Sequence, residues 1–119
     1  MDYDFFLELL YPLPLRHKKM FGIDAFYIGE KIVFAFYKKD DTLQENGIWV
    51  ATKREHHKSL LNEVKGLGYI KGYGPKTWLI LHETSDTFEE EANYIADLIK
   101  ANSPRIGNIP KSKGRAKIK

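Results

Sequence analysis

Two runs of aromatic and β-branched residues, separated by Gly29-Glu30, constrain the fold of this chain more than any other feature of its sequence. The runs span residues 20–28 and 31–38. A glycine at the first of two loop positions is typical of a type II′ turn, which joins neighbouring antiparallel strands. The sequence therefore predicts a β-hairpin, and the fold must contain an antiparallel sheet.

The register of this hairpin predicts which residues share a face. If pairing continues from the turn without interruption, Tyr27 lies opposite Ile32 and Ala25 lies opposite Phe34. Because side chains alternate between the two faces of a strand, this register defines both faces. The face expected to lie beneath helices is almost entirely apolar and consists of Phe21, Ile23, Ala25, Tyr27, Ile32, Phe34 and Phe36.

The opposite face of the hairpin is mixed, yet it carries more apolar surface than a solvated antiparallel face normally does. Its large apolar and aromatic residues include Met20, Phe26, Ile28, Val33 and Tyr37. These residues are a candidate interface with a second copy of the chain, since a self-complementary patch closes into a two-fold dimer. A loop, or the segment around Leu13 and Leu15, is the alternative cover.

The remaining sequence predicts three helices and three further strands. The helices are expected near residues 2–11, 52–65 and 86–101, and the strands at 48–51, 69–73 and 78–82. Asp2, Thr52 (with Glu55) and Asp86 are expected to cap the helices. The order α-β-β-β-α-β-β-α predicts an α+β fold: a two-layer sandwich in which about five antiparallel strands carry helices on one face.

The length of 119 residues fits one domain, and the charge is unevenly distributed along it. Residues 103–119 hold six basic residues and no acidic one, which leaves 13 Lys+Arg against 16 Asp+Glu in residues 1–102. We therefore expect a single domain over residues 1–102 and a flexible basic tail over residues 103–119.

The basic tail is a candidate for sequence-independent binding of nucleic-acid phosphates. Its cations are Arg105, Lys111, Lys113, Arg115, Lys117 and Lys119. A solubilising terminus explains the same composition at least as well, because the tail has no aromatic residue to stack on bases.

Few residues indicate catalysis or metal binding. The chain has no cysteine, which excludes disulfides, a thiol nucleophile and a thiolate zinc site. His56 and His57 are adjacent, so on a helix they diverge and cannot chelate one metal. Residues 68–77 lack the glycine positions of a phosphate loop. His82 beside Glu83 is a modest acid/base candidate, and no catalytic residue, metal ligand or cofactor is assigned.

No apolar run approaches the roughly 20 residues that a membrane-spanning helix requires. The N-terminus is acidic, where a signal peptide would be basic. We expect a cytoplasmic protein that does not enter a membrane.

A stretch around the hairpin, residues 16–35, resembles the opening of the TfoX N-terminal domain family. In that family a basic residue precedes a Met-Phe-Gly hairpin, and the matching positions here are Lys18, Met20, Phe21, Gly22, Tyr27 and Lys31. The order of the later strands and helices is also similar. Ile23 stands where family members commonly repeat the glycine, and residues 68–78 resemble instead the related YjbR-like proteins.

This resemblance implies a small cytoplasmic α+β module, often without known enzymatic activity, and the TfoX name is tied to regulation of competence genes. It identifies no catalytic residue. The first expectation is therefore a non-catalytic interaction or regulatory module. Nucleic-acid binding through the tail is the second, and a small enzyme or ligand-binding protein with a site near His82 is the third.

Overall fold

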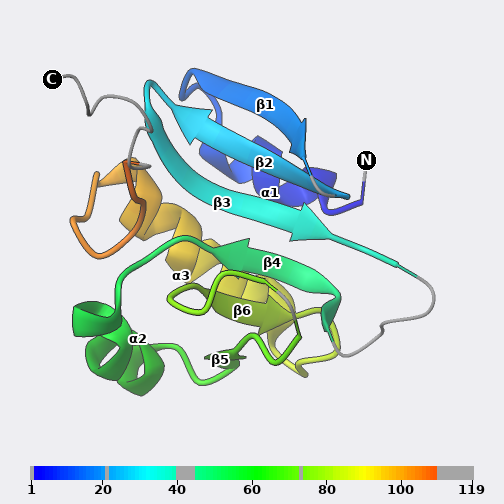
Figure 1. Cartoon of the computed structure of the whole chain (residues 1–119), viewed down its shortest axis with the longest axis vertical. Coiled ribbons are helices and arrows are strands. Elements are labelled where there is room, and N and C mark those ends of the chain that lie inside the picture. Colours follow the sequence, from blue (N-terminus) through cyan, green and yellow to red (C-terminus); the bar gives the residue numbers. More distant parts are fainter. Residues whose placement is uncertain (1, 21, 40–44, 73, 110–119) are drawn as a thin grey trace, which may run out of the picture.

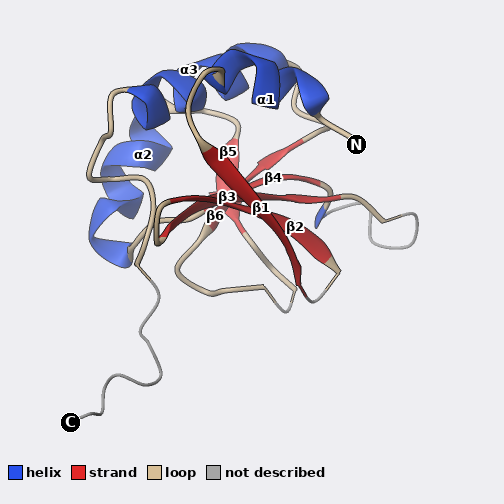
Figure 2. Ribbon diagram, turned by 90° about the horizontal axis from the view of Figure 1, so that it is seen from above, coloured by secondary structure: helices blue, strands red, loops and turns tan. Residues whose placement is uncertain are grey.

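The computed structural model describes residues 2–20, 22–39, 45–72 and 74–109 (Figure 1). They form one antiparallel sheet of six strands together with three α-helices, so the predicted α+β class is confirmed. Figure 2 shows the helices gathered on one side of the sheet and loops on the other. The two sides of the sheet are therefore covered in different ways.

The strand order in the sheet is β1-β2-β3-β4-β6-β5, and every neighbouring pair is antiparallel. The strands are β1 (Leu15–Met20), β2 (Ile23–Ile28), β3 (Lys31–Tyr37), β4 (Gly47–Val50), β5 (Leu67–Tyr69) and β6 (Leu79–His82). The predicted hairpin is β2 and β3. Strand β1 is additional to the five that the sequence predicts.

Strand β1 forms one edge of the sheet and is rich in positive charge. Residues 16–19 are Arg, His, Lys and Lys, and all four are exposed. Charged side chains are typical of an edge strand, where they oppose pairing with another chain. Because these residues are charged, the segment lacks the alternation of apolar and polar residues that indicates a strand. The sequence therefore does not predict it.

A β-bulge in β3 changes the register of the hairpin. The pairs beside the turn are as predicted, but the pair that follows Tyr27 and Ile32 is Phe26 with Phe34. Val33 is therefore an extra residue, and both Val33 and Phe34 lie beneath the helices. The uninterrupted register expected from the sequence is wrong beyond this point.

The bulge also corrects the predicted faces. Phe34 and Phe36 lie beneath the helices as expected, and Phe26 joins them there. Four residues expected on the same face lie instead on the opposite one, namely Ile23, Ala25, Tyr27 and Ile32. Phe21 lies outside the described residues. A slip of one residue transfers every following side chain to the other face, so a single bulge has this large effect.

The five residues expected to form an interface do not share one surface. Phe26 and Val33 are 4% and 1% exposed beneath the helices, and Ile28 packs against the same cluster. Tyr37 is buried on the opposite face, where Met20 is partly buried. Self-association therefore remains a hypothesis without an assigned surface.

The three α-helices are α1 (Asp4–Leu10), α2 (His57–Glu63) and α3 (Phe88–Lys100), and a 3₁₀ turn, η2 (Arg54–His56), leads into α2. The predicted caps are wrong by one position. The N-cap residues of α1, η2 and α3 are Tyr3, Lys53 and Thr87, and none makes a side-chain cap hydrogen bond. The Thr52 hydroxyl instead donates to the carbonyl of Arg105 at 2.6 Å.

The core on the helix side is built around α3 and the aromatic residues of the hairpin. Helix α3 buries Ala92, Ile95, Ala96 and Ile99. Phe6 of α1 meets Phe34 edge-on, with ring centroids 4.9 Å apart. The helices therefore pack against one face of the sheet, and no described helix covers the other face (Figure 2).

Residues 103–109 pack on the domain, so the boundary expected at residue 102 is wrong. Ile106 is 2% exposed within the helix-side core. The Gly107 amide donates to the Ala51 carbonyl, and Asn108 forms a β-bridge with Ile32. The apolar contacts of Ile106 and these backbone hydrogen bonds hold the segment against the domain, although its Pro and Gly content is typical of a loop. Residues 110–119 lie outside the described residues.

Candidate functional site

The sheet face opposite the helices, here called the open face, has an apolar cluster of its own. Its members are Ile23, Ala25, Tyr27, Ile32, Ala35, Tyr37, Trp49, Ala51, Ile70, Trp78 and Ile80. Residues 70–72 and 74–78, between β5 and β6 and here called the covering segment, fold over part of this face. Ile70 and Trp78 at its two ends are 7% and 8% exposed. The open face therefore carries apolar surface that includes Tyr37 and Met20 of the anticipated set, whereas Phe26 and Val33 lie on the other face.

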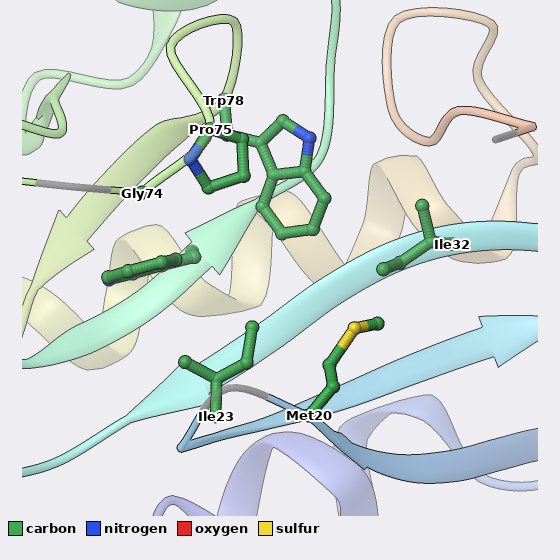
Figure 3. Close-up of a pocket in the computed structure, with 7 residues that line it drawn as sticks. Met20, Ile23, Ile32, Gly74, Pro75 and Trp78 are labelled. Carbon is green, nitrogen blue, oxygen red and sulfur yellow. The ribbon is translucent and has the colours of Figure 1, made fainter. Parts of the chain in front are cut away.

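A pocket of about 510 Å³ remains between this segment and the strands. Its lining combines Met20, Ile23, Ile32 and Trp49 from strands β1 to β4 with Gly74, Pro75 and Trp78 from the covering segment. Figure 3 shows Trp78 and Pro75 on one side of the hollow and Ile23, Met20 and Ile32 on the other. Among the described residues that line the pocket none is titratable, so this lining offers apolar contact.

Trp49 is a fixed wall of the pocket. Its indole Nε1 donates to the Glu45 carbonyl at 3.0 Å, and its ring stacks on Tyr37 with centroids 4.9 Å apart. The hydrogen bond satisfies the polar atom of a side chain that is only 2% exposed. The orientation of this wall therefore does not depend on a ligand.

Close approach of the covering segment to Trp49 requires glycine at position 74. A Cβ placed on Gly74 would lie 2.7 Å from a carbon of the Trp49 ring and 3.0 Å from Ile70. The Trp78 amide donates to the Pro75 carbonyl, which closes a turn between them. The glycine-rich stretch that does not fit a phosphate loop thus serves as the lid of an apolar pocket.

Helix α2 supports the same segment from the other side. His57 is 7% exposed, and its Nε2 lies 2.7 Å from the Thr77 carbonyl. A carbonyl only accepts, so this ring nitrogen must carry the proton and donate it. His57 therefore holds the chain beside Trp78.

Positive charge lies along the β1 edge of the open face. Regular pairing with β2 places Arg16 opposite Tyr27 and Lys18 opposite Ala25, both partners being members of the open-face cluster. The Arg16 guanidinium lies over the Tyr27 ring, 4.6 Å from its centroid. Alternate residues of β1 thus direct Arg16 and Lys18 to the pocket's side of the sheet.

His17 and Lys19, which alternate with Arg16 and Lys18 on β1, face the helix side and are paired with Asp24. His17 and Lys19 lie 2.8 and 3.3 Å from an Asp24 carboxylate oxygen. Burial opposes ionisation of Asp24, but hydrogen bonds from His17 and Lys19 outweigh it and lower the pKa of the carboxyl below its usual value. The charges of Lys19 and Asp24 therefore balance each other, and neither is left to pair with a ligand.

His82 and Glu83 do not form the acid/base pair considered from the sequence. The Glu83 carboxylate accepts hydrogen bonds from the Tyr3 hydroxyl at 2.7 Å and from Lys38 Nζ at 2.6 Å. Burial alone would raise the pKa of Glu83, but these donors lower it below its usual value. Within the described ranges no ion pair joins Glu83 to His82. Glu83 therefore has a structural role.

Of the six basic residues proposed to bind nucleic acid, the structure describes one. Arg105 makes two hydrogen bonds to the Glu63 carboxylate, each 3.0 Å long. The other five lie in residues 110–119, outside the described residues: Lys111, Lys113, Arg115, Lys117 and Lys119. Arg105 is thus committed to an internal ion pair.

The described part of the chain contains no group of three or more His, Cys, Asp or Glu side chains able to hold a metal ion. No helix within it has the length and apolar character needed to cross a membrane.

Comparison with known proteins yields no relative: no protein-family model matches the chain, and no curated protein or solved structure matches it. Fold and site together define a small α+β protein with an apolar pocket on the helix-free face of its sheet.

Sequence reasoning missed the pocket because its walls come from six separate places in the chain. The two tryptophans are the signal that could have found it. Trp49 and Trp78 are the only Trp residues of the sequence, and one lies in a strand while the other ends a Gly-Pro turn. Large aromatic residues flanking such a turn indicate a turn packed on a sheet rather than one exposed to solvent.

Proposed function

We propose that this chain is a non-catalytic binding or regulatory module, and that its open-face pocket binds a small apolar molecule. The observation that carries the proposal is the described lining of the pocket, which is apolar and includes two tryptophans. Ligand sites are concave, mostly apolar and roughly 300–1,000 Å³ in volume, and a pocket of about 510 Å³ lies in that range.

Binding is a better proposal than catalysis because no acid, base or nucleophile is among the described residues that line the pocket. Catalysis needs an acid, base or nucleophile within hydrogen-bond reach of a substrate. The carboxylates of Asp24 and Glu83 do not line the pocket, and both are paired with neighbouring cations. An enzyme with a site near His82 is therefore the weaker hypothesis.

The TfoX-like resemblance supports the regulatory half of the proposal. The resemblance lies in residues 16–35, and Met20 within it lines the pocket. A ligand seated between β1, β2 and the covering segment would stabilise one arrangement of that segment. Such a change offers a partner protein a surface that depends on the ligand. A cytoplasmic location belongs to the same proposal.

Titration with N-phenyl-1-naphthylamine, a neutral apolar probe whose fluorescence rises on leaving water, tests the proposal. The unmodified chain should enhance the fluorescence in a saturable way. Met20→Glu places a charge at the wall of the pocket and should weaken binding about tenfold or more, because the charge must be desolvated. Tyr11→Glu is the matched control, since Tyr11 is 82% exposed and does not line the pocket.

Two results would refute the proposed function. One is the absence of saturable enhancement with the folded, unmodified chain. The other is equal binding by the unmodified chain and Met20→Glu, with circular dichroism showing that both are folded.

A further inference from the structure

A row of positively charged residues lies on β1 beside one wall of the pocket, and no described carboxylate is paired with them. On β1, Arg16, Lys18 and Met20 alternate with residues that face the helices, so they share one face and successive members lie about 7 Å apart. Met20 lines the pocket. Lys18, the next residue on that face, is thus within reach of the pocket mouth.

Lys18 is the cation of this row that is available to a ligand. It is exposed, and no hydrogen bond or ion pair with another described residue engages it. Arg16 rests on the Tyr27 ring and donates to the Gly29 carbonyl at 3.1 Å, which leaves its charge unneutralised. By contrast, Lys19 on the reverse side is paired with Asp24.

We propose that the pocket selects amphipathic anions: small molecules whose apolar body fills the pocket and whose carboxylate pairs with Lys18, with Arg16 adding to the positive field. This inference rests on the proposed function and adds the ligand class to it. The charge complements the ligand at the edge of the pocket, where the head group keeps contact with water and avoids the large desolvation penalty of a buried charge.

Two other occupants fit the open face less well. Unpaired bases need exposed aromatic rings to stack on, whereas Tyr27, Tyr37, Trp49 and Trp78 are each at most 8% exposed. The chain's own residues 110–119 follow Asn108 in the sequence, and Asn108 bridges to the pocket residue Ile32. They carry five cations and no acid, so the charges of Arg16 and Lys18 would repel them.

The test uses three eight-carbon ligands below their micellar concentrations: octanoate, octanol and octylammonium. Each competes with N-phenyl-1-naphthylamine for the full-length chain. Octanoate should bind at least about fivefold more tightly than octylammonium, since exposed charge pairs change affinity severalfold in either direction. The ratio should shrink as salt rises from about 0.02 to 0.5 M, because exposed charges are screened.

A matched pair of variants locates the selection. Lys18→Gln should reduce the octanoate preference about two- to threefold. Lys19→Gln removes the same charge from the adjacent residue on the opposite face, and it should leave most of the preference in place. Both variants should still bind the neutral probe, since neither residue lines the pocket.

The outcomes separate this inference from the function on which it rests. Equal affinities for octanoate and octylammonium, with probe binding intact, would overturn the anion selection and leave the binding function standing. Failure of the probe itself to bind would overturn both. A preference that survives Lys18→Gln but disappears when Lys111, Lys113, Lys117 and Lys119 are changed to Gln would assign selection to the C-terminal residues and overturn the role of β1.

Discussion

Gly74 lies directly against the indole ring of Trp49, so closely that a Cβ at position 74 would be 2.7 Å from a ring carbon. This contact joins the covering segment of the pocket to the centre of the sheet. Because Trp49 is held by its own hydrogen bond and by stacking on Tyr37, the ring cannot move aside without losing both. The fit of the segment over the pocket therefore depends on this glycine.

Gly74→Ala should destabilise the protein by about 1–3 kcal/mol, the usual effect of overpacking a well-filled site. Urea denaturation measures the change in free energy of unfolding. Gly68→Ala is the matched control, because a Cβ there would lie an ordinary 3.8 Å from the His82 ring. Equal effects of the two substitutions would contradict the close contact at Gly74.

Ile106→Ala should reduce the free energy of unfolding by about 2–5 kcal/mol, the range for emptying a buried isoleucine site. Ile106 is 2% exposed, although the sequence places it in a segment expected to be a flexible tail. Ile109→Ala makes the same chemical change three residues later at a side chain that is 66% exposed. It should alter stability by no more than about 0.5 kcal/mol. Similar small effects at both positions would show that residues 103–109 do not contribute to the domain.

The hairpin illustrates how much of this fold local sequence can predict. Its turn, its two strands and its first pairs follow from a Gly-first loop between β-rich runs, which is a local property. The bulge at Val33 is not local. Val33 and Phe34 both find space beneath the helices, so distant packing decides which of two apolar faces each residue joins. Where both faces of a strand are apolar, alternation cannot indicate its register.

The pocket and the docking of residues 103–109 were beyond sequence reasoning for a related reason. Each depends on contacts between residues far apart in the chain, such as Trp49 with Gly74 and Ile32 with Asn108. The composition of residues 103–109 is typical of a loop, and the segment forms no helix or strand. Composition does not indicate whether a loop packs against the domain or leaves it.

Asp24 should make stability depend on pH in the acid range. Its folded pKa lies below the ordinary value of 3.8, because hydrogen bonds from His17 and Lys19 outweigh the effect of burial. Protonation then favours the unfolded chain, so this contribution is fully present above about pH 4 and is lost as pH falls through the folded pKa. Asp24→Asn should be less stable than the unmodified chain near pH 6.

The difference in unfolding free energy between Asp24→Asn and the unmodified chain should shrink as the pH falls below about 4, since a protonated Asp resembles Asn. Urea denaturation at a series of pH values measures it. A difference that stays constant across the series would mean that Asp24 stabilises the fold without its charge.

Nucleic-acid binding by the C-terminal residues should involve five of the six cations that the sequence offers. Arg105 is engaged with Glu63, so the candidates that remain are Lys111, Lys113, Arg115, Lys117 and Lys119. If each neutralises one phosphate of duplex DNA, affinity should fall with salt on a log–log slope of about −4.5 and should not depend on base sequence.

Lys113→Gln should reduce the magnitude of this slope by about 0.9, whereas Arg105→Gln should leave it unchanged. Fluorescence anisotropy with labelled duplexes of two unrelated sequences measures both. Equal slope changes in the two variants would mean that Arg105 leaves Glu63 to bind phosphate, and no binding at low salt would eliminate this function.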